Sequence, residues 1–234
     1  VEEQVDLMYS LIHQQVDAIV LVPIDSKALV QPVVEAGRKG VPVINIDIRW
    51  DTQLLEQAGV EVAFVGPDNF AAAYEVGKLL DKKLRNEDKV VIIEGLAAAD
   101  NAQQRKRGFI KAIEEKGLRL VASEPADWET EKAAEVFQAM WMRYPDLKAV
   151  YCSNDAMALG VLQQMQEKNC YLPVVGFDND AVMKEFLSTG KQVATADIFS
   201  SQMAVRGIEF ALDVLEGKIE NRGVHSTAYE IIKQ

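Results

Sequence analysis

The chain has 234 residues, which suffices for two lobes of modest size, and its hydrophobic fraction of 49% can fill their cores. The chain carries 25 Lys and Arg residues against 36 Asp and Glu residues, and this net charge of -11 argues against direct nucleic-acid binding, which needs phosphate neutralisation. The longest apolar runs are far shorter than the roughly 18 to 20 residues of a membrane span.

A helical pattern over 1–15 opens the chain, and short runs rich in Val and Ile then alternate with helical patterns. We predict strands at residues 18–23, 43–47, 62–65, 89–94, 118–123, 149–153, 174–178 and 193–196. Between and after them we predict helices at residues 26–39, 69–85, 102–116, 129–144, 156–168, 181–188 and 202–216. Residues 49–61 are only mildly helical. This alternation is typical of parallel sheets with crossover helices, so the expected class is α/β with doubly wound sheets.

The predicted elements divide into two lobes. We expect the first lobe to hold residues 1–67 and 199–226, and the second to hold residues 68–198 and 227–234. The connections near Pro67, near 197–199 and near 226–229 would make a hinge of three crossings. Few strands precede residue 68, so the first lobe is too small to bury its own core, and we expect it to be incomplete at its N-terminal end.

Polar residues follow several predicted strands, namely Asp47, Asn154 with Asp155, and Asp178. In open parallel sheets the ligand crevice lies beyond the carboxyl ends of the strands, where the strand order reverses. The alternative is that each of these residues caps the next helix. Either role is consistent with these side chains taken one at a time.

The sequence offers little for metal binding or catalysis. Cys152 and Cys170 lack a CxxC partner or a nearby histidine cluster, and His13 and His225 are far apart. We find no Gly-rich phosphate loop, GxSxG elbow or metal-ligand spacing. We therefore expect no cofactor, no metal and no enzyme activity.

Four sequence motifs, taken in their order along the chain, point more specifically to a family than the strand and helix pattern does. Val-Pro-Val-Ile-Asn-Ile-Asp ends at Asp47, Arg-Lys-Arg-Gly-Phe ends at Phe109, Ser-Asn-Asp-Ala-Met-Ala-Leu-Gly ends at Gly160, and Val-Val-Gly-Phe-Asp ends at Asp178. In this order they resemble the ribose-binding-protein-like sugar-binding proteins, the type I periplasmic binding proteins that serve ABC transporters. The resemblance covers nearly the whole chain. Because members of that family open with a strand, a helix and a second strand, it also implies that this sequence lacks its first strand-helix-strand.

The resemblance implies a set of ligand-binding residues. Asp47 and Asp178 match sugar-contacting carboxylates, and Arg105 and Asn154 match the arginine and the amide. Such groups accept or donate hydrogen bonds at sugar hydroxyls. The alternative for Arg105 is a surface arginine paired with Glu114 or Asp100.

Aromatic and flanking residues complete the candidate site. Trp128 matches the aromatic residue that stacks on the sugar face, although it could instead pack on the following helix. Phe177 could line the pocket or belong to the core. The remaining candidates flank the motifs, and they are Arg49 and Trp50 at the rim, Asn101 and Asp197.

The sequence also departs from the family at three positions. Ile48 stands where ribose binders have an arginine, and Val22 stands where they have an asparagine. Near the third hinge, Ile198 or Asp197, depending on the alignment, stands where a glutamine is expected. A hexose, another pentose or a polyol therefore fits as well as ribose.

The resemblance implies an extracytoplasmic solute-binding protein that closes around a small sugar or polyol for delivery to an ABC transporter. Its partners would be the ligand and a membrane permease, and a transport protein of this kind would be monomeric and periplasmic. Two alternatives share the fold: the sugar-sensing ectodomain of a histidine kinase, whose partner is a membrane-bound signalling protein, and the effector domain of a LacI-type repressor.

Overall fold

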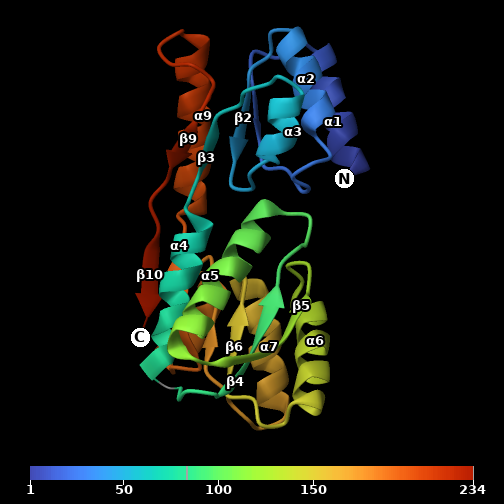
Figure 1. Ribbon diagram of the computed structural model, residues 1–234. Coiled ribbons are helices and arrows are strands. Elements are labelled where there is room, and N and C mark those ends of the chain that lie inside the picture. The colour runs from blue at the N-terminus through green and yellow to red at the C-terminus, as the bar shows by residue number, and fades with distance from the viewer. Residues whose placement is uncertain (83, 234) are drawn as a thin grey trace. The chain divides into compact units, whose positions relative to one another are not determined.

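The computed structural model describes residues 1–82 and 84–233 (Figure 1), and it confirms the predicted α/β class. The chain divides into two compact units. Unit 1 comprises Val1–Pro67, Ala98–Asn101 and Phe199–Ala228, and unit 2 comprises Asp68–Ala97, Ala102–Ile198 and Tyr229–Gln234.

Unit 1 is built on a parallel sheet in the order β1-β2-β3-β9. The strands are β1 (Ile19–Leu21), β2 (Val43–Ile46), β3 (Phe64–Gly66) and β9 (Val224–Ser226), and the helices are α1 (Glu2–His13), α2 (Val30–Arg38), α3 (Thr52–Gln57) and α9 (Ser200–Leu215). Val43 packs in a core with α1 and α2, whereas its neighbour Ile44 packs with Phe210 of α9. Helices therefore cover both faces of this sheet, as alternation along β2 requires.

Unit 2 is built on a larger sheet in the order β10-β8-β7-β6-β4-β5. The strands are β4 (Lys89–Glu94), β5 (Arg119–Pro125), β6 (Ala149–Cys152), β7 (Val174–Val175), β8 (Gln192–Asp197) and β10 (Glu230–Lys233), of which only β10 runs antiparallel to its described neighbour. The helices are α4 (Asn69–Gly77), α5 (Asp100–Lys116), α6 (Thr130–Arg143), α7 (Asp155–Glu167) and α8 (Lys184–Ser188), with short 3-10 helices η1 (Lys78–Lys82) and η2 (Ala181–Met183).

The two faces of the unit 2 sheet have separate cores. Ile93 and Cys152 pack with Phe137 of α6 and the apolar side of α7. On the other face, the ring of Tyr151 lies 5.4 Å from that of Phe109 on α5. Helices α4 and α5 come close at Gly108, where a Cβ atom would lie 2.5 Å from the carbonyl oxygen of Phe70. A larger residue at Gly108 would force these helices apart.

The strand order of unit 2 positions the loops that matter for function. After β4 the chain moves outward to β5, and it then returns to β6 on the other side of β4. The order reverses between β4 and β6, so the loops after these two strands diverge at their carboxyl ends. Such a switch point is where open parallel sheets bind ligands.

The predicted helix boundaries were wrong in two places. The helix predicted over 26–39 begins only at Val30, because the Asp25 carboxylate accepts hydrogen bonds from the amides of Lys27 and Ala28 and folds that segment into a turn. The helix predicted over 69–85 is α-helical only to Gly77 and continues as η1. Its last positions include residue 83, which lies outside the described residues.

Two further differences concern short elements. Residues 52–57 form α3, where only a mild tendency was predicted, because the Asp51 side chain accepts a hydrogen bond from the amide of Leu54. The strand predicted over 174–178 is reduced to Val174–Val175. Asp178 and Asn179 adopt positive φ values of 104° and 59°, which turn the chain away from the sheet.

Candidate ligand-binding site

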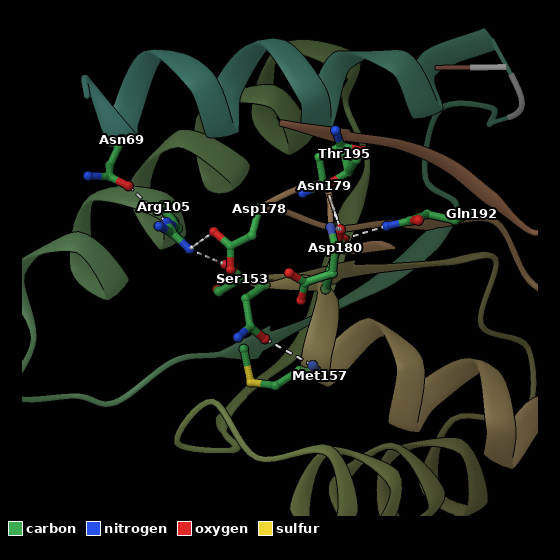
Figure 2. A network of polar contacts seen from close by, with 11 residues as sticks. Asn69, Arg105, Ser153, Met157, Asp178, Asn179, Asp180, Gln192 and Thr195 are labelled. Atoms are coloured by element: carbon green, nitrogen blue, oxygen red, sulfur yellow. Dashed lines mark hydrogen bonds and ion pairs between the residues drawn. The ribbon is translucent and has the colours of Figure 1, made fainter. Parts of the chain in front are cut away.

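Arg105 is the central residue of a polar cluster in unit 2 (Figure 2), and only 3% of its surface is exposed. Its Nε donates to Oδ1 of Asn69 at 2.9 Å, and its Nη1 donates to the carbonyl oxygen of Ser153 at 2.8 Å. A buried guanidinium needs such partners because desolvation of an unpaired charge is costly. The alternative of a surface arginine paired with Glu114 or Asp100 is therefore wrong.

Asp178 approaches Arg105 from the turn after β7. Its Oδ1 lies 3.5 Å from Nη1 of Arg105, a long contact for a hydrogen bond, and 26% of the Asp178 side chain is exposed. The backbone at Asp178 has a φ of 104°, a conformation that non-glycine residues rarely adopt. Strained residues of this kind cluster at functional sites, so the turn itself directs attention to Asp178.

Two aromatic rings lie against the Arg105 guanidinium. Its Cζ is 3.7 Å from the ring centroid of Phe177 and 5.5 Å from that of Trp128. Both contacts stabilise the charge through the ring quadrupole. Phe177 has no exposed surface, so it is a core residue that supports Arg105 and not a wall of the pocket.

Trp128 follows β5 on a short loop with left-handed backbone at Asp127 and Trp128, where φ is 51° and 71°. Its indole lies directly over Gly95, since a Cβ atom there would be 2.0 Å from Cη2 of Trp128. The side chain is half-buried and also packs against the core formed with α6 and α7. The position is compatible with both predicted roles, a stacking surface and packing on the following helix.

Asn154 is the N-cap of α7. Its Oδ1 accepts a hydrogen bond of 2.9 Å from the amide of Met157. The capping alternative is thus correct for the oxygen, while the Nδ2 group remains the part of the amide that could donate to a ligand. Asp197, another candidate, accepts a hydrogen bond of 2.9 Å from Nδ2 of Asn179.

Three candidates in unit 1 have distinct surroundings. Asp47 follows β2 with a φ of 63° and is partly buried. The Cζ of Arg49 lies 5.7 Å from the ring centroid of Phe64, and Asn101 is 4% exposed. Each remains a predicted ligand contact.

Trp50, by contrast, is not a rim residue. Its side chain is 2% exposed and packs in the core beside α1 and α2. The cause is local: the Asn45 side chain accepts from the amide of Trp50 at 3.0 Å and donates to the carbonyl oxygen of Ile48 at 2.8 Å. These bonds fold the segment back after β2 and turn the indole inward.

Two contributors to the cluster were not predicted from the sequence: Asn69 and the Ser153 carbonyl group. Asp155 was noted as a polar residue at a strand end, but it was not chosen as a ligand contact. No sequence pattern predicts that the Ser153 carbonyl oxygen accepts a hydrogen bond from an arginine side chain. Within the part of the chain that the structure describes, no group of three or more His, Cys, Asp and Glu side chains could hold a metal ion.

Residues 1–219 match the family model described as a periplasmic binding protein domain. The chain belongs to this family. The predicted membership in the ribose-binding-protein-like periplasmic binding proteins is confirmed, and with it the periplasmic location. None of the helices in the described ranges is long and apolar enough to cross a membrane.

Relatives of this periplasmic binding protein are named for the sugars they bind. It is 42% identical over 234 residues to the D-ribose/D-allose-binding protein of Pseudomonas aeruginosa, a match that covers 98% of this chain and 73% of that protein. It is 33% identical to the D-allose-binding periplasmic protein of Escherichia coli, with 91% and 70% covered. These proteins are binding proteins and not enzymes.

A solved structure gives the same assignment of fold. The periplasmic solute-binding protein of an ABC transporter from Actinobacillus succinogenes, with bound D-allose, matches with a TM-score of 0.93 and 31% identity. The match covers 99% of this chain and 83% of that chain.

Proposed function

We propose that this protein binds a neutral aldose of the D-allose and D-ribose type in the periplasm and delivers it to an ABC transporter. The observation that carries the proposal is the arrangement around Arg105, a buried guanidinium held by protein groups at Nε and Nη1 beside a partly exposed carboxylate. The names of the relatives support the same ligand class.

The polar groups of the cluster match the hydrogen-bonding needs of a sugar. Each sugar hydroxyl can donate one hydrogen bond and accept others. Asp178 can accept from two adjacent hydroxyls, while Nη2 of Arg105 and Nδ2 of Asn154 can donate to their oxygens. The indole of Trp128 offers a flat apolar face to the C–H side of the ring. Together they supply donors, an acceptor and a stacking surface.

The charges favour a ligand without net charge. The guanidinium of Arg105 already has the carboxylate of Asp178 at 3.5 Å. A sugar phosphate would bring a further dianion next to that carboxylate, which is unfavourable at short range. A neutral sugar avoids this repulsion and still receives charge-assisted hydrogen bonds.

Delivery to a transporter and closure of the two lobes around the ligand are part of the same proposal. Asp47 and Arg49 are the unit 1 residues that we propose as further ligand contacts. A ligand favours the closed state only to the extent that it binds that state better, so contacts from both lobes would drive closure.

Calorimetric titration with matched sugars tests the proposal. D-Allose and D-ribose share their configuration at C2 to C4, and D-glucose and D-xylose are their respective C3 epimers. We expect the first pair to bind at least about tenfold more tightly, which corresponds to about 1.4 kcal/mol for one mispaired hydroxyl. The bound sugar should be recovered unchanged.

Two results would contradict the proposal. The first is the absence of heat and of thermal stabilisation with every neutral sugar, because a bound ligand must stabilise the fold by mass action. The second is release of a chemically altered sugar, which would make the protein an enzyme.

A further inference from the structure

The turn over residues 176–180 carries Asp178 and is held at several points. The amide of Gly176 donates to the carbonyl oxygen of Ala194 at 3.0 Å, and the amide of Asp178 donates to that of Ala196 at 2.7 Å. These bonds continue the ladder to β8 beyond the end of β7. They do not explain how the positive φ values at Asp178 and Asn179 are maintained.

Asp155, the first residue of α7, contacts both flanks of this turn. Its amide donates to the carbonyl oxygen of Phe177 at 2.7 Å, and its Oδ2 accepts from the amide of Asp180 at 3.0 Å. Phe177 and Asp180 bracket the two strained residues. The backbone amide and the side chain of Asp155 therefore hold the turn on both sides of Asp178.

The Asp155 carboxylate is itself fixed from β8. Its Oδ1 accepts from Nε2 of Gln192 at 2.6 Å and from Oγ1 of Thr195 at 3.0 Å. All three residues have no exposed surface. Figure 2 shows Gln192, Thr195 and Asp180 converging on this network beside Asp178 and Arg105. The packing is tight, since a Cβ atom at Gly176 would lie 2.0 Å from Oδ1 of Asp155.

We propose that Asp155 is a positioning residue of the sugar site, which holds the 176–180 turn so that Asp178 faces Arg105 and the ligand. The inference rests on the proposed function, because it concerns the affinity of the same site. Asp155 has no exposed surface with which to touch the sugar. It acts through Asp178.

The chemistry of Asp155 gives this role a pH signature. Burial raises the pKa of Asp155 to about 6, and the nearby Asp180 raises it as well, while hydrogen bonds from the Asp180 amide, Gln192 and Thr195 lower it. The other titratable group that faces it is the Cys152 thiol of β6, whose pKa is raised by burial and by Asp155. Every partner of the carboxylate is a donor, so protonation removes an acceptor and loosens the turn.

The expected signs are opposite for affinity and for stability. Affinity should fall as the pH drops through about 6, because the ligand needs the turn that the ionised carboxylate holds. The pKa of Asp155 is higher in the folded chain than in the unfolded chain. Its contribution to fold stability is therefore present at acid pH and is lost as the pH rises through about 6.

The test is a calorimetric titration of the parent and three variants with D-allose. Asp155→Ala should raise the Kd about tenfold or more at neutral pH, as expected when a charge-assisted hydrogen bond is lost. Val161→Ala is the matched control, because Val161 is a buried residue of the same helix in the α6–α7 core. It should lower the Tm while leaving the Kd within about twofold.

The pH dependence of sugar affinity in Asp155→Asn is a measurement that a purely structural role of Asp155 would not change. Between about pH 7.5 and about pH 5.5 the parent should lose about threefold in affinity, and Asp155→Asn should lose less than half as much. Every other titratable group is the same in the parent and in Asp155→Asn, so its effect cancels in the comparison. This arm keeps the inference testable even where Asp155→Ala fails to fold.

The outcomes separate the two proposals. A parent that binds no sugar overturns the proposed function and this inference with it. The inference alone is overturned if the parent binds the sugar and Asp155→Ala binds it equally tightly. It is also overturned if the affinity of Asp155→Asn depends on pH in the same way as that of the parent.

Discussion

Trp128 illustrates how a single glycine can decide the shape of a binding surface. Its ring lies so close to the backbone at Gly95 that a Cβ atom there would overlap three ring atoms at 2.0 to 2.3 Å. Gly95 is not needed for an unusual φ, since it is absent from the positive-φ glycines of the described residues. What requires glycine at this position is space for the indole, and the indole in turn contacts Arg105.

We predict that Gly95→Ala displaces Trp128 and weakens sugar binding by about tenfold, a loss in the range of an aromatic contact plus local repacking. Gly37→Ala is the matched control, because nothing lies within 4 Å of its would-be Cβ and it is helical. The control should raise the free energy of unfolding by about 0.5 kcal/mol and leave the Kd unchanged. Equal sugar affinity in Gly95→Ala and the parent would remove Trp128 from the site.

Local hydrogen bonds explain what could and could not be foreseen for single residues. Arg105 could be predicted as a ligand contact, because it lies in one of the motifs that resemble the ribose-binding-protein-like family. The inward turn of Trp50 could not, because it depends on two hydrogen bonds of Asn45 that no spacing rule encodes. The position of Phe177 beneath Arg105 depends likewise on where the turn after β7 begins.

At the scale of elements, the start of α7 combines a helix cap with the candidate site. Asn154 caps the helix at Met157, and the adjacent Asp155 fastens the neighbouring turn. The N-terminus of α4 offers a comparison, since Asp68 caps it through the amide of Ala71 at 2.8 Å. The two caps stabilise their helices in the same way, but only Asn154 is a predicted ligand contact.

Replacing each cap by alanine should therefore separate the two roles. Asn154→Ala and Asp68→Ala should each lower the free energy of unfolding by about 1 kcal/mol, measured by urea denaturation. Only Asn154→Ala should also weaken sugar binding, by about 0.5 to 1.5 kcal/mol. If Asn154→Ala and Asp68→Ala bind the sugar equally well, Asn154 is a cap alone.

Element boundaries show where sequence patterns lose their information. The strand over 89–94 was predicted to the residue, because a continuous apolar run over 90–93 lies between the charged residues Lys89 and Glu94. The end of β7 and the start of α2 were misplaced, because turns stabilised by Asp25 and by Asp155 compete with the regular elements. Polar residues at strand ends thus indicated the site and also obscured the boundaries.

At the scale of the whole molecule, the net charge of -11 does not determine the ligand. The candidate site balances Arg105 with Asp178, so its chemistry differs from that of the acidic surface. Long-range attraction should play little part in binding a neutral sugar.

Sugar affinity should accordingly be insensitive to salt. Between about 0.05 M and about 0.5 M NaCl we expect the Kd to change by less than about twofold, because screening acts on charged ligands. Titration of the same sugar at both salt concentrations measures this. A steep loss of affinity with salt would indicate that the natural ligand is an anion.

The most direct measurement is a calorimetric titration of D-allose into the parent and into Asp178→Ala, with Val161→Ala as the control for a change in stability. We predict that the parent binds and that Asp178→Ala loses about 1.5 to 3 kcal/mol of binding free energy, as expected for charge-assisted hydrogen bonds. The same Kd for the parent and for Asp178→Ala would contradict the assignment of the sugar site to this cluster in unit 2.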